Sequence, residues 1–150
     1  MLKYFKENQL VHYETKQPAN WQEAVRLSSQ MLINKDLITS EYVDEIIRNV
    51  ENNGPYIVIA EQIAMPHAAA DSLGVKGTGI SFTKFPDPVM FKDAETGETI
   101  PAILFFTLAA KDSESHLENI MNLMDLLMDE ATVQSLLETQ TMADFNVLLG

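Results

Sequence analysis

The 150-residue sequence contains no cysteine, which excludes disulfide bonds, thiolate metal sites and cysteine nucleophiles together. No apolar run approaches the roughly 20 residues that a helix needs to cross a bilayer. The N-terminal stretch MLKYFKENQ has no signal-peptide core. From these absences we expect a cytoplasmic protein without a membrane-inserted segment.

Basic residues are also scarce. The chain has 10 lysines and arginines against 22 aspartates and glutamates, a formal net charge of −12. Such a chain should be repelled by phosphate backbones, so nucleic acid is not an expected partner, whereas a basic partner protein would be attracted. The length and the 46% hydrophobic content suit one globular domain over residues 1–150.

Helical periodicity predicts helices before residue 54 and again toward the C-terminus. Asn20 has the form of a helix cap with Glu23 three residues later, and a second helix begins at Thr39 or Ser40. Gly54 and the proline that follows end this second helix. The last 20 residues are predicted to form two short helices.

A further helix is predicted to begin at Ser115, where Ser-His-Leu-Glu has the form of a capping box. Three methionines at helical spacing, Met121, Met124 and Met128, are expected to pack in the core, because methionine commonly fills gaps there.

Strand-like segments occupy the region between these helices and one stretch before them. They are Gln9–Thr15, a buried segment beginning at Tyr56, Ile80–Phe85, Val89–Phe91 and Ile100–Leu108. Pro86 and Pro88 are expected to bracket a turn, and residues 92–98 an exposed hairpin loop. The almost wholly apolar last strand should be central and covered on both faces. The chain is therefore predicted to be an α/β protein, a three-layer α/β/α sandwich around a mixed sheet.

The chemistry is expected at His67. Pro66 fixes its own φ and restricts the residue before it, so His67 is held on a stiff, non-helical segment after an apolar strand. Three alanines follow, leaving room for an approaching molecule. Neutral imidazole is abundant at pH 7 and can act as a nucleophile. The alternative is a solvated or hydrogen-bonded loop histidine without function.

His116 lies in the first turn of its predicted helix, where free backbone N–H groups and the helix dipole favour an anion. If the loop of His67 meets this turn at one end of the sheet, the two would form a phosphate-sized site with a nucleophile and a donor. The alternative is that His116 only decorates the helix start. His12 is assigned no role.

A metal site is the rival interpretation of two histidines near acids such as Asp71 or Asp112. The sequence lacks the His-x-x-x-His or Glu-x-x-His spacing that places ligands on one helix face. We therefore expect no bound metal.

The segment Ile63–Ala68, IAMPHA, resembles the Ile-Ala-x-Pro-His signature of EIIA components of the bacterial sugar phosphotransferase system (PTS), in the mannitol/fructose class. The resemblance covers nearly the whole chain and includes Trp21–Val25, a tyrosine at 42 before an Ile-Ile pair, and Leu108–Ala110 followed by Ser-His. GPYIVIA and AMPH look most like the ascorbate-type subgroup.

The resemblance implies a mixed, roughly five-stranded sheet with helices on both sides. It also implies that His67 accepts a phosphoryl group from the phosphohistidine of the carrier HPr. The group then passes to a cysteine of a cognate EIIB, which works with a membrane EIIC in sugar uptake. His116 would orient the phosphoryl group, together with backbone N–H groups near residues 116–118. No cofactor is implied, because donor and acceptor are both protein side chains.

An exposed apolar rim made by Ile63, Met65 and the alanines would dock these partners. Two departures from the family pattern stand out. Ala68 replaces a glycine found in many relatives, and Asn49 stands where mannitol-type members carry an arginine that could pair with the phosphoryl group.

Two other functions stay open. An EIIA-like regulatory module would use the phosphorylation state of His67 to control a partner protein, and a small-molecule-binding α/β domain would involve no phosphoryl chemistry. Neighbouring genes for EIIB and EIIC would favour transport. The sequence leaves the sugar and the oligomeric state open, a homodimer included.

Overall fold

The computed structural model describes residues 1–70 and 72–150. In this part of the chain the strands form one five-stranded sheet in the order β1-β4-β5-β3-β2. The strands are β1 (Val11–Tyr13), β2 (Val58–Ala60), β3 (Gln62–Ala64), β4 (Gly79–Lys92) and β5 (Thr99–Ala109). The helices are α1 (Leu2–Glu7), α2 (Trp21–Asn34), α3 (Ser40–Asn53), α4 (Ser113–Leu127), α5 (Glu130–Glu138) and α6 (Met142–Leu148).

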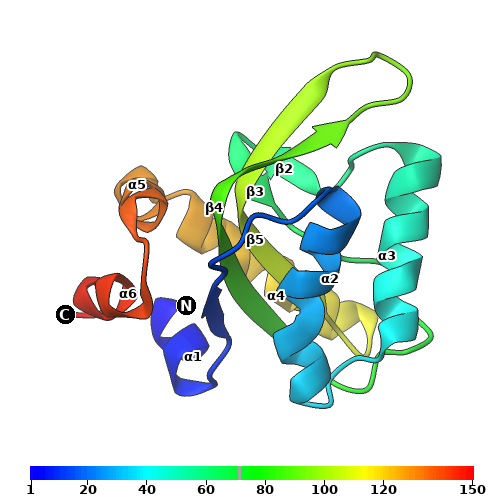
Figure 1. Ribbon diagram of the computed structural model, residues 1–150. Helices are drawn as coiled ribbons and strands as arrows, with labels where there is room; N and C mark the ends of the chain where they lie inside the picture. Colours follow the sequence, from blue (N-terminus) through cyan, green and yellow to red (C-terminus); the bar gives the residue numbers. More distant parts are fainter. Residues whose placement is uncertain (71) are drawn as a thin grey trace.

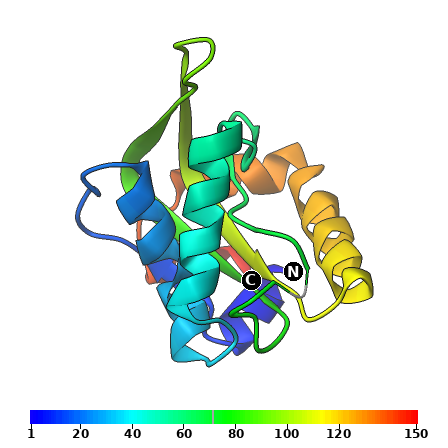
Figure 2. The same ribbon diagram turned by 90° about the vertical axis from the view of Figure 1, so that its right-hand side faces the viewer.

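The sheet is mixed and covered by helices on both faces, which confirms the predicted three-layer α/β/α fold (Figure 1). β4 pairs antiparallel with β5, whereas β1 with β4 and β3 with β5 are parallel. Figure 2 shows the sheet between α2 and α3 on one side and α4 on the other. β5 is central and largely buried, as its apolar sequence predicts.

Alternate side chains of β4 and β5 pack on opposite faces of the sheet. On one face Ser81 and Thr107 both donate hydrogen bonds to the backbone carbonyl of Ser28 in α2. On the other face Phe82 stacks on Phe106 with ring centroids 5.1 Å apart. The small hydroxyl residues let α2 lie close to the sheet, and the aromatic residues fill the wider space opposite.

The prediction of a turn at Pro86 and Pro88 is wrong, because β4 runs continuously from Gly79 to Lys92. Its pairing with β5 shifts in register between Lys84 and Val89. The prolines lie in this irregular part, where proline's missing donor is tolerated. The side chain of Gln17 replaces a neighbouring strand there, because it accepts from Asp87 N and donates to the carbonyls of residues 87 and 88.

The segment beginning at Tyr56 is two short antiparallel strands, β2 and β3, rather than one buried strand. The chain reverses tightly at Glu61, and Gln62 has a φ of 68°. β2 is therefore an edge strand of which Val58 and Ile59 are only half-buried, and β3 carries the chain toward His67.

Three predictions about helices also need correction. α1 at the N-terminus was not predicted, and α4 begins at Ser113 with Asp112 as its cap, ahead of the predicted cap Ser115. The methionine stripe is not core: Met121 is 59% exposed and Met128 is 79% exposed, while Met124 packs partly against the core.

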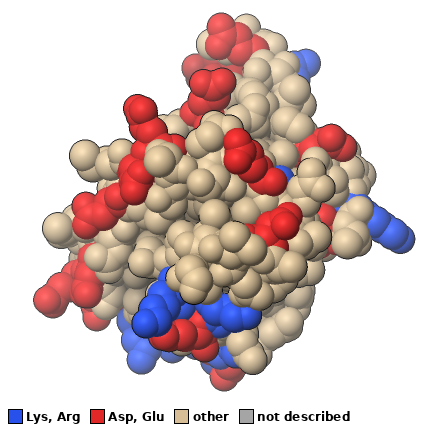
Figure 3. Space-filling model, turned by 90° about the vertical axis from the view of Figure 1, so that its left-hand side faces the viewer, with Lys and Arg blue, Asp and Glu red and all other residues tan. Residues whose placement is uncertain are grey.

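Acidic residues are spread over the face that carries α1, α5 and α6, whereas basic residues gather at its lower end, level with α1 (Figure 3). The excess of acids over bases in the sequence thus leaves a mainly acidic surface on this side.

Candidate functional site

His67 lies just beyond β3, on a segment tied to two neighbours in the sheet. The Met65 N–H donates to the carbonyl of Ile57 at 2.7 Å, and the Leu108 N–H donates to the carbonyl of Pro66 at 3.0 Å. These bonds extend the pairing past the end of β3 to the residue before His67. The predicted stiff, non-helical position is thus present.

The two ring nitrogens of His67 differ in their surroundings. Nδ1 lies 2.6 Å from the carbonyl oxygen of Met65. A carbonyl only accepts, so Nδ1 carries the proton and Nε2 keeps its lone pair. Burial lowers the pKa of His67 from its ordinary 6.5; the hydrogen bond to Met65 opposes this, and nearby His116 adds to it. The ring is therefore neutral at pH 7, with Nε2 available for bonding.

The structure brings His116 to the same end of the sheet. The two imidazole centroids are 5.7 Å apart, with their planes inclined at 38°. α4 is fixed against β5 by Asn119, one turn further along, whose side-chain amide donates to the carbonyl of Ala109 at 3.1 Å. A helix anchored so close to His116 gives the second imidazole a defined place beside the first.

The prediction that backbone N–H groups near residues 116–118 are free to bind a phosphoryl group is wrong. The His116 N–H already bonds the carbonyl of Asp112, and the Ser115 N–H bonds the Asp112 carboxylate. Because α4 starts earlier than predicted, residues 117 and 118 are within its hydrogen-bonded body. The backbone N–H groups of this stretch are therefore already bonded and not free for an anion.

A hollow of about 420 Å³ opens over the two histidines. Its lining residues are Asn49, Asn53, Tyr56, His67, Ala68, Ala69 and His116. Among these described residues there is no carboxylate, although acids outnumber bases about two to one in the chain. Imidazole, amide and hydroxyl groups without competing negative charge suit an anion such as a phosphoryl group.

Tyr56 and Asn53 belong to this lining, and sequence reasoning did not identify them as site residues. The Tyr56 ring meets the His67 ring edge to face, with centroids 5.3 Å apart. A tyrosine directly after Gly-Pro, at the very start of the predicted buried segment, was the available signal.

The prediction of an exposed apolar rim is wrong for Ile63, Met65 and Ala68, which are at most 5% exposed because they pack inward from β3 and the segment beyond it. Ala69 is exposed, as predicted, and lines the hollow. The larger exposed apolar side chains near the histidines belong to α4: Leu117 is 58% exposed, and Met121 lies one turn further along.

Within residues 1–70 and 72–150, no group of three or more His, Cys, Asp and Glu side chains could hold a metal ion. Asp71, named above as a potential ligand, lies outside the described residues, and Asp112 caps α4. His12 in β1 bonds Glu14 with its Nε2 at 3.0 Å.

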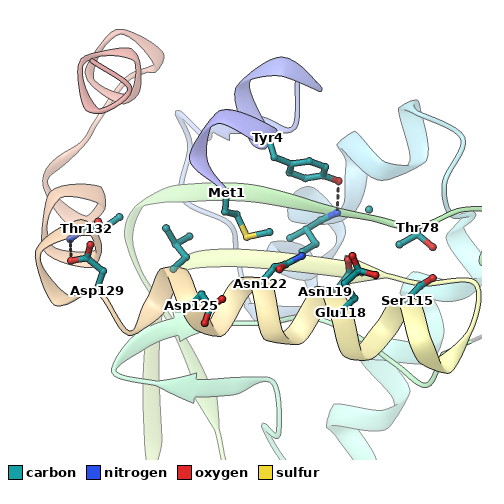
Figure 4. Close-up of a pocket in the computed structure, with 13 residues that line it drawn as sticks. Met1, Tyr4, Thr78, Ser115, Glu118, Asn119, Asn122, Asp125, Asp129 and Thr132 are labelled. Atoms are coloured by element: carbon teal, nitrogen blue, oxygen red, sulfur yellow. Dashed lines mark hydrogen bonds between the residues drawn. The ribbon is translucent and has the colours of Figure 1, made fainter.

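A larger hollow, about 760 Å³, lies between α1 and α4 (Figure 4). Among its described lining residues are three carboxylates of Glu118, Asp125 and Asp129, and no histidine. Figure 4 shows the polar face of α4 opposite Met1 and Tyr4. Negative charge there disfavours a phosphoryl group, so the candidate site is the hollow over His67.

The fold and this site define an α/β protein in which a neutral imidazole lines a surface hollow without a carboxylate among its described lining residues. The chain belongs to the family described as "Phosphoenolpyruvate-dependent sugar phosphotransferase system, EIIA 2", whose model matches residues 4–149. It is accordingly a phosphotransferase component. None of the described helices is long and apolar enough to cross a membrane.

The relatives agree with this assignment. The ascorbate-specific PTS EIIA component of Salmonella choleraesuis (strain SC-B67) is 36% identical over 122 residues, which cover 81% of this chain and 77% of that protein. The solution structure of the mannitol-specific cryptic phosphotransferase enzyme IIA from Escherichia coli is similar to this chain with a TM-score of 0.80 and 32% identity, covering 96% of this chain and 93% of that one.

A second similar structure includes a partner. It is the complex of enzyme IIAMTL and phosphorylated enzyme IIBMTL from Escherichia coli, with a TM-score of 0.72 and 25% identity, covering 92% of each chain. In that complex the relative is bound to a phosphorylated enzyme IIB.

Proposed function

We propose that residues 1–150 act as one phosphoryl-carrying domain in which Nε2 of His67 accepts the group from phospho-HPr and passes it to a cognate EIIB. The observation that carries the proposal is the Nδ1 bond to Met65, which leaves Nε2 as the nucleophilic nitrogen of a neutral ring. The family assignment supports the reaction, and the complex of a relative with phosphorylated EIIB supports the partner.

Two transfers follow from this role. In the first, the Nε2 lone pair of His67 forms a bond to phosphorus as the N–P bond of the HPr phosphohistidine breaks, and the HPr imidazole takes back its electron pair. In the second, the cysteine sulfur of EIIB forms an S–P bond as the Nε2–P bond breaks. Positioning and electrostatic stabilisation are the protein's contribution to such loose transition states.

His116 is proposed as the donor that orients the phosphoryl group. Its ring centroid lies 5.7 Å from that of His67, on a helix anchored to β5. A ring N–H directed at a phosphoryl oxygen would stabilise charge as it develops in transfer.

The docking surface for HPr and EIIB is proposed to be the exposed apolar side of α4, defined by Leu117, Met121 and Met128. These residues recur at helical spacing and are each more than half exposed. The stripe begins one residue after His116, so a partner that covers it would also cover the hollow. Contact through a small apolar patch suits a transient complex.

The proposed partners place this exchange in the cytoplasm and connect it to a membrane EIIC. Relatives named for ascorbate and for mannitol are both similar to this chain, so the substrate proposed is a sugar of this general kind.

The test is incubation with phosphoenolpyruvate, enzyme I and HPr. We expect one acid-labile phosphate per chain, no label in His67→Ala, and unchanged labelling in the control His12→Ala. Label that survives in His67→Ala would refute the assignment. His116→Ala should accept phosphate but transfer it poorly to EIIB, and normal transfer by this variant would remove the role proposed for His116.

A further inference from the structure

The peptide bond between His67 and Ala68 is held at both of its polar ends by tyrosine hydroxyls. Tyr56 Oη donates to the carbonyl oxygen of His67 at 2.5 Å. The N–H of Ala68 donates to Tyr42 Oη at 3.1 Å. The two tyrosines come from different places in the chain, Tyr42 from α3 and Tyr56 from the segment before β2.

Tyr42 connects this peptide to the central strand. It is 1% exposed, and its hydroxyl donates to the carbonyl of Leu108 in β5 at 2.7 Å. The N–H of the same Leu108 donates to the carbonyl of Pro66. One residue of β5 therefore fixes the chain immediately before His67 directly, and immediately after it through Tyr42.

Tyr56 is the accessible half of the arrangement, 38% exposed at the rim of the hollow. Its hydroxyl uses its proton on the carbonyl of His67, so toward the Asn49 side chain, which lines the same hollow and lowers the Tyr56 pKa, it can act only as an acceptor. Asn49 can thereby act on His67 through Tyr56.

We propose that Tyr42 and Tyr56 form a clamp on the His67–Ala68 peptide that positions Nε2 of His67 for phosphoryl transfer, and that Asn49 acts through Tyr56. This inference rests on the function proposed above. Rotation of the clamped peptide plane would change the backbone angles on either side of it and turn the imidazole away from the hollow. Misplacement by about 1 Å can cost about 100-fold in rate.

Both hydroxyls keep their protons at neutral pH. Burial raises the pKa of Tyr42 to about 12, despite the opposing hydrogen bond from Ala68. Burial also raises the pKa of Tyr56, opposed by the hydrogen bond with Asn49. Each tyrosine thus remains a donor to its carbonyl across the range in which the transfer would be measured.

The test compares Tyr56→Phe, Tyr42→Phe and Asn49→Ala with the control Tyr13→Phe. Tyr13 is also a half-buried tyrosine that loses one hydrogen bond, from its hydroxyl to Thr139 Oγ1 at 2.8 Å, but it lies in β1 at the opposite edge of the sheet from β2. We expect each clamp variant to accept one phosphate on His67, about 10-fold or more slowly from phospho-HPr. The control should keep the parental rate.

Two measurements separate positioning from a merely structural role. The imidazole ¹⁵N shifts of His67 should show loss of the single Nδ1–H form in Tyr56→Phe and keep it in Tyr13→Phe. Asn49→Ala should add nothing to the rate effect of Tyr56→Phe if it acts through that residue.

Rates within twofold of the parent in Tyr56→Phe, with unchanged His67 shifts, would overturn the clamp, as would an additive effect of Asn49→Ala. Because Tyr56 lies at the surface, its variant should fold even if Tyr42→Phe does not. Absence of phosphate on His67 in the parent chain would instead contradict the proposed function.

Discussion

The His67 side chain shows how one ring can be prepared for chemistry by its own neighbours in sequence. The carbonyl that binds Nδ1 belongs to Met65, two residues earlier, and the intervening proline holds the chain between them in extended form. The nitrogen that faces the hollow is decided by this local contact, without a carboxylate partner among the described lining residues.

At the same scale we predict the titration of His67. Its pKa is lowered, first by burial and then by His116, so an NMR titration should place its midpoint below 6.5. A midpoint of His67 at or above 6.5 would contradict the buried, neutral ring.

The same shift affects stability. As pH falls below 6.5, the unfolded chain takes up the proton before the folded one, so this histidine makes the folded state less stable down to its folded pKa. Above 6.5 the effect is absent. Stability measured from pH 7.5 downward should therefore decline less in His67→Gln than in the parent.

Individual site residues could be predicted from the sequence where the local pattern itself carries the chemistry. Pro-His after an apolar strand and a histidine near a helix start are both visible in the printed sequence. The contribution of Tyr56 depends on the tight reversal at Glu61, which turns a single predicted strand into two and brings residue 67 back beside residue 56.

At the scale of elements, α4 carries both the second histidine and the proposed docking stripe, and its start depends on Asp112. We predict that Asp112→Ala lowers the folding equilibrium constant about fivefold, because the Ser115 N–H loses its acceptor. Asp112→Asn keeps a capping oxygen and should stay close to the parent. Urea unfolding of the three proteins tests this, and equal stability of all three would show that the cap is unimportant.

The exposed side of α4 gives a second prediction at this scale. Leu117→Ser with Met121→Ser should raise the KM for phospho-HPr about tenfold, with little change in single-turnover rate at saturation, because the stripe contributes binding rather than chemistry. Val147→Ser in α6 removes an even more exposed apolar side chain away from the histidines and serves as the control. An unchanged KM in the double variant would place docking elsewhere.

Elements with strong sequence periodicity were predicted well. Elements that depend on contacts with residues far away in the sequence were not. The cap of α2 at Asn20 is confirmed by its bond from the Glu23 N–H. The continuity of β4 through two prolines was missed because it depends on Gln17, 70 residues away from its partner Asp87.

At the scale of the whole molecule, Phe82 connects the sheet to its less regular helical layer. Its ring centroid lies 5.1 to 6.1 Å from those of Phe5 in α1, Phe106 in β5 and Phe145 in α6. The sheet class could be predicted from the order of helices and strands. This aromatic cluster could not, because α1 was not recognised.

We predict that Phe82→Ala destabilises the protein by about 3–5 kcal/mol, since it leaves a cavity where two helices and a strand pack against Phe82. Met90→Ala, on the same strand and 55% exposed, should change the free energy of unfolding by less than about 0.5 kcal/mol. Chemical denaturation measures both. A loss below about 1 kcal/mol in Phe82→Ala would mean that the cluster contributes little to stability.

The central claim is that the phosphoryl group resides on one particular nitrogen. NMR of the protein labelled with ¹⁵N-histidine and phosphorylated through enzyme I and HPr identifies that atom by its coupling to phosphorus. Coupling to Nε2 of His67, with Nδ1 still protonated, is the predicted result. Coupling to Nδ1 of His67, or to a nitrogen of any other residue, would contradict the account.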